Sequence, residues 1–139
     1  RGIVQRQREV SLTSEQIRAL RIMTTSGEKP VIELSGGNQQ KVVVAKWLLT
    51  DSDLIIFDEP TRGIDVGAKA EIYGIINDLA NQGKAVLIIS SDMPELIGLS
   101  DRIYTMKDGE ITGELTRDPE KGFAQEEIMR LIIEGREAT

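Results

Sequence analysis

Asp58 and Glu59 are the residues whose types and spacing could do chemistry most directly. They follow the apolar run 54–57, and an acidic pair at the carboxyl end of a buried strand lies where open α/β sheets place their ligands. Mg²⁺ prefers carboxylate and water oxygens, so one carboxylate can hold the metal ion while its neighbour aligns and deprotonates an attacking water. Taken alone, such a pair is more often the solvated start of a loop.

Ser35, Gly36 and Gly37 form a second candidate site, because they precede a helical pattern over 38–49. The amino end of a helix offers free N–H groups and a partial positive charge, which suit a phosphate, and Ser35 adds a hydroxyl donor. Glycine costs about 1 kcal/mol relative to alanine in a helix. Two glycines in the first turn therefore suggest that something approaches the backbone closely. An ordinary capped helix with a tight entry loop explains this pattern equally well.

The elements that position these residues follow from the hydrophobic pattern. Continuous apolar runs at 54–57 and 85–89 favour strands of a parallel sheet that is covered on both faces. The stretch 68–80 has one apolar face and predicts the helix that connects the two strands. Strand, helix and strand together predict a parallel crossover unit.

Later segments predict a hairpin and a final helix. A short strand over 103–106 leads to Asp108-Gly109, a strong signal for a two-residue turn, and the chain returns along 110–115. Apolar residues then recur at helical spacing around 128–132.

Two further helix starts are predicted from capping patterns. The segment 13–16 resembles a capping box and predicts that a short helix begins there. Asp92 precedes Pro94 and Glu95, which predicts a helix with Asp92 as its cap. Trp47 is expected to pack in the core, since aromatic side chains mostly fill cores.

The composition is that of an ordinary globular protein and excludes several classes of function. The chain has 139 residues, no cysteine and no histidine, so disulfides and thiolate metal sites are excluded. The net charge of −6 disfavours a protein that coats nucleic acid. The apolar runs are far shorter than the ~20 residues that cross a bilayer. Because the chain begins with Arg1 instead of Met, we interpret it as a fragment of something longer.

The order and spacing of these features resemble the ATP-binding cassette family. The segment 34–40 resembles its signature motif, with Asn38 where glutamine is more usual. The run 54–58 resembles the Walker B strand, Glu59 resembles the catalytic glutamate, and 61–65 matches the position of the D-loop. Accidental agreement of all these motifs in order is improbable.

Three segments narrow the resemblance to one class of the family. The segments 38–41, 60–68 and 90–95 resemble the second cassette of the tandem ATPases that drive bacterial monosaccharide importers of the ribose, galactose and xylose type. This implies an α/β fold, a partial P-loop NTPase with a mainly parallel sheet, helices on both faces and a C-terminal β-hairpin. The implied parts are 1–33, a remnant of the helical subdomain; 34–115, the signature-to-switch part of the ATPase core; and 116–139, a helical tail.

Two departures from the family pattern limit what the chain can do alone. No Gly-x-x-x-x-Gly-Lys-Ser/Thr stretch is present, so the loop that cradles the phosphates is missing. We expect the isolated chain to bind ATP poorly and to be inactive as an ATPase. Ser91 stands where the family's switch histidine is expected, and serine cannot carry positive charge towards a transferring phosphate.

The resemblance also assigns roles to residues. Glu59 and Ser91 are the predicted catalytic residues, and Asp58 is the predicted ligand of Mg²⁺. Both cofactors, ATP and Mg²⁺, would require the missing phosphate loop or a partner cassette. Asp65 could couple two sites across a dimer, or could simply be a loop acid beside a helix. The predicted nucleotide-binding residues are Ser35, Gly36, Gly37, Asn38, Gln39 and Asp65.

The implied function is the C-terminal part of the ATP-binding subunit of a sugar importer. In this family each ATP lies between one phosphate loop and the partner's signature, so this signature should complete the ATP site of the partner cassette. The implied partners are a second nucleotide-binding domain, membrane permease subunits and, indirectly, a sugar-binding protein, but no nucleic acid. The implied location is peripheral, on the cytoplasmic face of the bacterial inner membrane.

Two alternatives stay open at this stage. Chromosome-maintenance and DNA-repair ATPases also separate the phosphate loop from a later signature segment, but residues 1–10 show no heptads of a preceding coiled coil. The other alternative is a non-catalytic module that only donates the signature and docks.

The resemblance also predicts a gap in the sheet. In related cassettes the phosphate-loop strand lies between the strands that correspond to 85–89 and 103–106. Unpaired strand edges invite pairing with another chain, so the isolated chain is expected to oligomerise or to swap strands.

Overall fold

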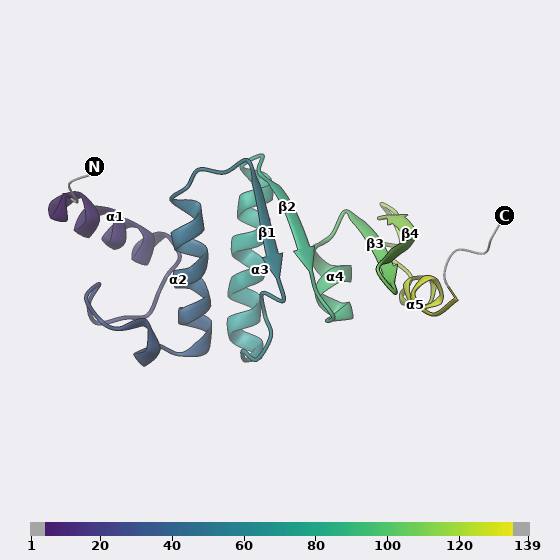
Figure 1. Cartoon of the computed structure of the whole chain (residues 1–139), viewed down its shortest axis with the longest axis horizontal. Helices are drawn as coiled ribbons and strands as arrows, with labels where there is room; N and C mark the ends of the chain where they lie inside the picture. Colours follow the sequence, from purple (N-terminus) through teal and green to yellow (C-terminus); the bar gives the residue numbers. More distant parts are fainter. Residues whose placement is uncertain (1–4, 135–139) are drawn as a thin grey trace. The chain divides into compact units, whose positions relative to one another are not determined.

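The computed structural model describes residues 5–134 and divides into two compact units (Figure 1). The first unit ends at Leu87 and the second begins at Ile88. Residues 1–4 and 135–139 of the predicted end segments lie outside the described part.

The first unit holds the elements that carry most of the predicted site. In chain order they are α1 (Arg6–Ala19), the 3₁₀ helix η1 (Val31–Glu33), α2 (Gly36–Leu48), β1 (Leu54–Asp58), α3 (Val66–Asn81) and the start of β2 (Ala85–Ile89).

The start of α1 was predicted wrongly. The helix begins at Arg6, so Thr13 lies inside it and does not cap it. The sequence of residues 6–12 shows no apolar period, in keeping with a helix that buries no side chain. Several of these residues are nevertheless good helix formers. Gln5 is the residue before the helix and makes no side-chain capping bond, so no capping signal marks this end either.

The predicted crossover unit is confirmed. The arrows of β1 and β2 run side by side in the same direction, and α3 connects them (Figure 1). Ile72, Ile76 and Leu79 of α3 are buried, as the helical period predicts. The backbone N–H of Ala85, the first residue of β2, donates to the carbonyl of Asp53, the residue before β1, at 2.8 Å.

One face of β1 is open, in contrast to the predicted burial on both faces. The side chain of Phe57 is buried, whereas Leu54 and Ile56 are 53% and 57% exposed. Alternate residues of a strand point to opposite faces, so the pattern describes one covered face. A continuous apolar run does not distinguish one covered face from two, which is why the sequence-based expectation failed here.

The second unit contains a short helix, a hairpin and the last helix. Its elements are α4 (Met93–Leu99), β3 (Arg102–Lys107), β4 (Glu110–Thr116) and α5 (Gln125–Glu134). The predicted start of α4 is confirmed, because Asp92 Oδ1 accepts a hydrogen bond from the backbone N–H of Glu95 at 3.2 Å. Pro94 lies in the first turn, where its missing N–H costs little.

The predicted two-residue hairpin turn is also confirmed. Asp108 has a φ angle of 51° and Gly109 one of 84°. These positive angles are the left-handed pair that suits the twist of a hairpin. A bulge that was not predicted interrupts the ladder, because Thr105 pairs with Gly113 and the next residue of β3 pairs with Ile111. Thr112 is therefore the extra residue.

The bulge and the last helix form the core of the hairpin side. Thr105 and Thr112 are buried, and their hydroxyl oxygens lie 2.9 Å apart. Ile128 of α5 is 1% exposed. A Cβ added to Gly113 would come within 2.6 Å of the Leu131 side chain, so this glycine permits α5 to pack closely on β4.

The four strands form two separate sheets, β1-β2 and β3-β4. Within the described residues β2 and β3 are not hydrogen-bonded neighbours, in agreement with the predicted gap. Between residues 5 and 134, no helix combines the length and the apolar character needed to cross a membrane.

Candidate functional site

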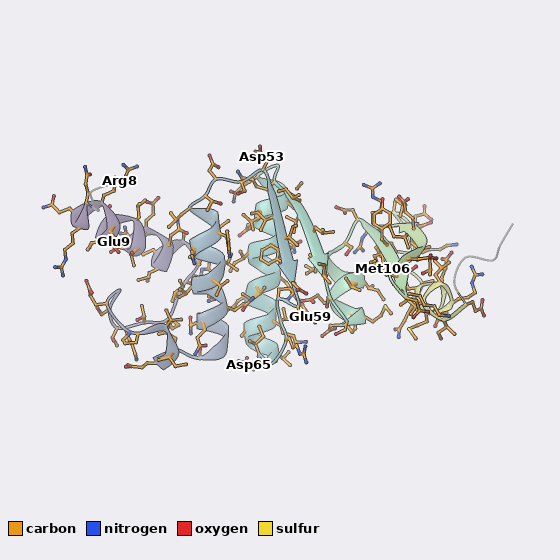
Figure 2. The ribbon with its side chains drawn as sticks, in the orientation of Figure 1. Arg8, Glu9, Asp53, Glu59, Asp65 and Met106 are labelled. Carbon is orange, nitrogen blue, oxygen red and sulfur yellow. The ribbon has the colours of Figure 1, made fainter. Side chains whose placement is uncertain are left out.

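Most predicted site residues gather at one edge of the first unit. The helices α2 and α3 both begin at this edge, and β1 ends there (Figure 1). Glu59 and Asp65 lie towards this edge, while Asp53, just before β1, lies at the opposite end (Figure 2). The fold thus brings the signature segment, the acidic end of β1 and the loop before α3 together, although they are separated in sequence.

Ser35 is the residue before α2, as predicted, but its side chain does not cap the helix. Its Oγ instead accepts a hydrogen bond from Asn38 Nδ2 at 2.8 Å. A hydroxyl that accepts one hydrogen bond keeps its hydrogen for donation, and the side chain is exposed. The first N–H groups of α2 have no partner within their own helix. Together these donors suit an anionic ligand.

Gly37 has a structural role that the sequence did not reveal. A Cβ added to Gly37 would lie 2.5 Å from Ala68 Cβ, so the group that approaches this glycine is the first turn of α3. At Gly36 the space is less tight, since an added Cβ would lie 3.6 Å from Ile64 Cγ2. The inference that something approaches closely was therefore right, but for Gly37 the approaching group is protein.

The amides of Asn38 and Gln39 face the segment before α2. Asn38 Oδ1 accepts from the backbone N–H of Met23 at 2.8 Å, in addition to the bond that its Nδ2 donates to Ser35. Gln39 Nε2 donates to the carbonyl of Leu34 at 2.9 Å. Both side chains therefore hold the entry to α2 in place, and their predicted contact with nucleotide stays a prediction.

Glu59 has an unusual backbone conformation. Its φ angle is 47°, in the left-handed region that non-glycine residues rarely adopt. Such residues cost about 1–3 kcal/mol and cluster at functional sites. The turn is held by a hydrogen bond from the Arg62 N–H to the Glu59 carbonyl at 3.2 Å, and Pro60 is fully buried. Asp58, by contrast, is exposed at the end of β1.

Asp65 caps α3. Its Oδ1 accepts a hydrogen bond from the backbone N–H of Ala68 at 3.0 Å, which satisfies one of the free donors of the first turn. The predicted role of Asp65 towards nucleotide is not tested by this contact. The residue does at least have a structural function at the edge of the site.

Ser91 belongs to the second unit, whereas Asp58 and Glu59 belong to the first. It is exposed and lies between β2 and Asp92, the cap of α4. The neighbouring Ser90 supports the same turn, because its Oγ accepts from the backbone N–H of Asp92 at 3.0 Å.

Asp58 has the chemistry of a magnesium ligand, although it offers only one carboxylate. Residues 5–134 contain no group of three or more His, Cys, Asp or Glu side chains that could hold a metal ion by themselves. Mg²⁺ typically uses one or two carboxylates together with water and substrate phosphates. The single exposed carboxylate therefore fits an ion that arrives with a nucleotide.

Lys41, which is 2% exposed, was not among the predicted site residues. Its Nζ lies 2.8 Å from Glu71 Oε2 and donates to the carbonyl of Arg21 at 3.0 Å. The signal was present, because Lys41 lies four positions after Gly37 and three before Val44, on the buried face of α2.

Trp47 was predicted to pack in the core, and this prediction is wrong. Its side chain is 55% exposed, and Lys46 Nζ lies 5.9 Å from the centre of its ring. The residue lies in the last turn of α2 and is not among the buried residues of that helix.

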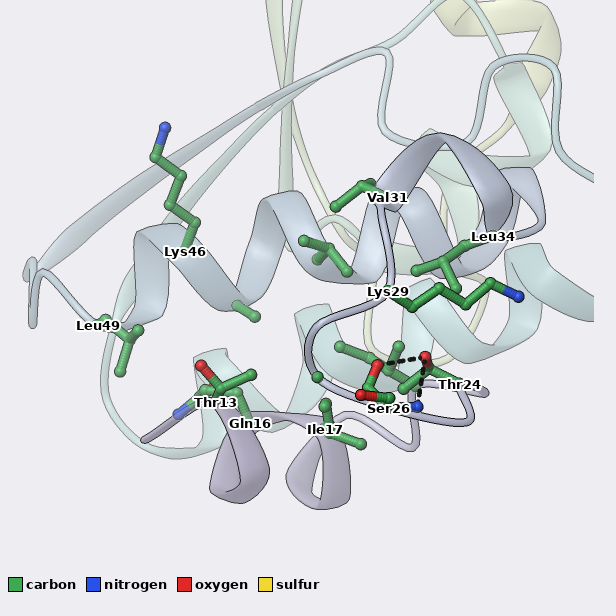
Figure 3. Close-up of a pocket in the computed structure, with 14 residues that line it drawn as sticks. Thr13, Gln16, Ile17, Thr24, Ser26, Lys29, Val31, Leu34, Lys46 and Leu49 are labelled. Atoms are coloured by element: carbon green, nitrogen blue, oxygen red, sulfur yellow. Dashed lines mark hydrogen bonds between the residues drawn. The ribbon is translucent and has the colours of Figure 1, made fainter. Parts of the chain in front are cut away.

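An apolar pocket lies apart from the predicted site residues. It has a volume of about 230 Å³ and is formed by α1, the loop that follows it and α2 (Figure 3). Ile17, Leu34 and Leu49 are among its apolar lining residues, and Thr24 Oγ1 donates to the Ser26 carbonyl at its rim at 2.8 Å. None of the predicted site residues lines it.

Comparison with known proteins identifies close relatives. A family profile described as "ABC transporter" matches residues 4–62. The Ribose import ATP-binding protein RbsA of Corynebacterium glutamicum is 47% identical over 95% of this chain and 25% of its own length. RbsA 1 of Rubrobacter xylanophilus is 49% identical over 99% of this chain and 27% of its own length.

A third relative extends the range of sugars named. The putative ribose/galactose/methyl galactoside import ATP-binding protein 1 of Rhizobium meliloti is 52% identical over 93% of this chain and 24% of its own length. The chain thus spans about a quarter of the length of these curated relatives.

Solved structures support the same fold. A bacterial ABC transporter cassette solved as a dimer matches with a TM-score of 0.71 and 26% identity, over 84% of this chain and 50% of that one. A nucleotide-free ATP-binding cassette matches with a TM-score of 0.74 and 25% identity, over 91% of this chain and 47% of that one. The predicted α/β fold with a parallel strand pair and a C-terminal hairpin is confirmed.

Proposed function

The chain belongs to the ABC transporter family of ATP-binding cassettes, and from this membership we propose that it is the C-terminal part of the ATP-binding subunit of a bacterial monosaccharide importer. The names of the relatives support import of ribose or a related sugar. The subunit would bind and hydrolyse ATP to drive transport by membrane permease subunits, which receive sugar from a binding protein. It would lie on the cytoplasmic face of the inner membrane.

The three predicted parts of the chain keep their assignments within this proposal. Residues 1–33 belong to the helical subdomain, 34–115 to the ATPase core, and 116–139 to a helical tail. The boundary at 34 follows from the start of the signature segment.

The observation that carries the proposal is the open amino end of α2. Ser35 is exposed there and keeps a hydroxyl hydrogen for donation, next to the first N–H groups of the helix. We propose that Ser35, Gly36 and Gly37, with Asn38 and Gln39 holding them in place, contact ATP that is bound to the phosphate loop of a partner cassette. Preorganised donors of this kind act where negative charge develops in a transition state.

The chain's own acidic residues serve a second, weaker site in this proposal. Asp58 would hold Mg²⁺ through one carboxylate oxygen, and Glu59 would align the attacking water. Ser91 would stand in for a histidine but cannot supply positive charge. Asp65, the last residue of the loop 61–65, would couple the partner's ATP site to the weaker site of this chain.

The test compares the two roles in the intact subunit. Loss of one preorganised donor typically lowers a rate by ~100- to 1000-fold. We expect Ser35→Ala to lower the ATPase rate and sugar import far more than Glu59→Gln does, because the signature serves the competent site. Ser52→Ala, at an exposed serine after α2, is the matched control and should leave both unchanged.

Gly37→Asp should also abolish the activity, but it is the less specific test. Any side chain at Gly37 collides with Ala68, so its effect combines the loss of ligand contact with displacement of α3. Equal ATPase rates for the wild type and Ser35→Ala would contradict the proposed role of the signature.

A further inference from the structure

Lys41 is a buried cation that the proposed chemistry does not use. Its side chain is only 2% exposed. Lysine is almost never fully buried unless it is paired. The residue lies in the second turn of α2, directly after the segment that presents Ser35. Packing of the core alone does not explain a buried charge so close to Ser35.

The partners of Lys41 come from three segments of the first unit. Lys41 itself belongs to α2, Glu71 belongs to α3, and Arg21 lies just past the end of α1. Nζ approaches Glu71 Oε2 to 2.8 Å and donates to the Arg21 carbonyl at 3.0 Å. Arg21 has a φ angle of 50°, so the chain reverses sharply at the point that this bond holds. One ammonium group therefore ties three segments together.

The ion pair is one of the contacts between α2 and α3. Another is at Gly37, where an added Cβ would meet Ala68 Cβ at 2.5 Å. Lys41 follows Gly37 by one helical turn, and Glu71 follows Ala68 by about one turn. Two contacts one turn apart define both the offset of the helices along their axes and their rotation about them.

The offset of the two helices decides how the site residues are presented. Ser35 immediately precedes α2, and Asp65 immediately precedes α3. An added Cβ at Gly36 would lie 3.6 Å from Ile64 Cγ2, in ordinary contact distance. Any slip of α3 against α2 would therefore change the position of the loop 61–65 relative to Ser35.

We infer that Lys41 is a positioning residue, whose ion pair with Glu71 fixes the register of α2 against α3 and so presents Ser35 and the loop 61–65 as one rigid surface to ATP on a partner cassette. The inference rests on the proposed function, because it assigns Lys41 a part in the same site. The nucleotide does not touch Lys41, which acts through Ser35.

If Lys41 served only the stability of the fold, kcat per folded molecule would not change in its variants. Removing one partner of a buried ion pair is strongly destabilising when it leaves the other charge buried and unpaired. Lys41→Met keeps the length of the side chain but loses the charge, so folding can survive while the register is no longer fixed by the pair. The Glu71 carboxylate that Lys41→Met leaves behind belongs to a side chain that is 56% exposed, whereas Glu71→Gln leaves the buried Lys41 ammonium without its counter-ion, so the amount of folded protein is measured for each variant.

The decisive experiment measures kcat and KM for ATP in the intact subunit, per folded molecule. A displacement of about 1 Å can cost ~100-fold in rate. Lys41→Met and Glu71→Gln should each lower kcat by at least ~10-fold with less than ~3-fold change in KM. Together they should lower it no further, since both remove the same contact. Lys41→Arg keeps the cation and should retain kcat within ~3-fold.

Lys46→Met is the matched control, because Lys46 is exposed on the same helix and contacts only the Trp47 ring among its described interactions. It should not change kcat. An unchanged kcat in Lys41→Met, or loss of kcat that only follows the loss of folded protein, would overturn the inference. No activity in the wild-type subunit would instead contradict the proposed function.

The register itself can be measured without any activity. The chain has no cysteine, so spin labels at Lys46→Cys and Asn77→Cys, both exposed, would be its only thiol sites. In this chain, Lys41→Met should shift or broaden the distance distribution between the labels, and Lys41→Arg should restore it. Identical distributions in the wild type and Lys41→Met would contradict a register fixed by the ion pair.

Discussion

Asp65 and Asn38 each have a structural role at the edge of the first unit, beside the nucleotide-binding role that we propose for them. Asp65 caps α3, and Asn38 joins Ser35 to the N–H of Met23. Each is a residue that the resemblance assigned to nucleotide binding. The structure adds a local reason for each, because their side chains hold the backbone that presents Ser35 and the loop before α3.

Residue types at the site could be predicted from the sequence, but their surroundings could not. The order and spacing of Ser35, Asp58 and Glu59 can be read from the sequence alone, and they supported the family resemblance. The φ angle of Glu59 and the contact between Gly37 and Ala68 depend on tertiary structure, which no local pattern encodes.

The exposed pair of Asp51 and Lys84 predicts a pH dependence of stability. Lys84 Nζ donates to Asp51 Oδ1 at 2.9 Å, and this hydrogen bond lowers the pKa of Asp51 below its usual 3.8 and raises the pKa of Lys84 above its usual 10.5. For the lowered acid, the stabilisation is present above pH 3.8 and is lost as pH falls through the lower folded value.

For Lys84 the sign is opposite, so its stabilisation is present below pH 10.5 and is lost as pH rises through the higher folded value. We expect Lys84→Met to melt slightly below the wild type between about pH 5 and 9, with the difference vanishing in strong acid, below the lowered pKa of Asp51. Thermal unfolding followed by circular dichroism at several pH values tests this. Lys121→Met, at another exposed lysine, should show no such pH-dependent difference. A difference between Lys84→Met and the wild type that persists unchanged in strong acid would contradict the assignment.

At the scale of elements, the pair α2 and α3 is the part of the fold that matters most for the site. Gly37 lets the two helices touch, and Lys41 with Glu71 joins them one turn later. The amphipathic pattern predicted α3 well, because its buried face repeats at helical spacing.

Elements without a buried face or a local signal were harder to predict. The start of α1 was missed because its first turns bury nothing. The hairpin turn at Asp108-Gly109 was found because its residues must adopt positive φ angles, which few residue types do. The bulge at Thr112 was missed, because a bulge depends on the partner strand and on the close packing of Gly113 against α5.

The cap of α3 predicts a measurable effect on stability. Asp65→Ala removes the side-chain oxygen that accepts from the Ala68 N–H. Such changes cost about 1 kcal/mol, and the free energy of unfolding from urea titration should fall by this amount. Asp78→Ala, at an exposed position of the same helix, is the control. Surface substitutions of this kind usually change stability by no more than about 0.5 kcal/mol. Equal effects of the two changes would show that Asp65 does not cap α3 in solution.

At the scale of the whole molecule, the open face of β1 is the feature with the largest consequence for association. Leu54 and Ile56 are more than half exposed, and the two sheets remain separate. Exposed apolar side chains on a strand, next to unpaired strand edges, are sites for association with another chain. The sequence predicted this only through the family resemblance, since composition and pattern alone predicted a covered sheet.

We therefore expect the isolated chain to self-associate as its concentration rises. Sedimentation velocity over a range of concentrations should show species larger than the 15.4 kDa monomer. Ile56→Thr should weaken the association, because it makes the open strand face more polar. Ile32→Thr is the control, since Ile32 is 82% exposed but lies in η1. A monomer at all concentrations, or equal effects of the two changes, would contradict this expectation.

Our central proposal is that this chain donates a signature to ATP bound elsewhere, and we expect it to bind no ATP phosphates by itself. The most direct test is a calorimetric titration of the chain with Mg²⁺-ATP, first alone and then with the first cassette of the same subunit. We expect no heat of binding for the chain alone, and tighter ATP binding by the mixture than by the first cassette by itself. Micromolar binding of Mg²⁺-ATP by the chain alone would contradict the proposal, because the phosphates would then have a site within these residues.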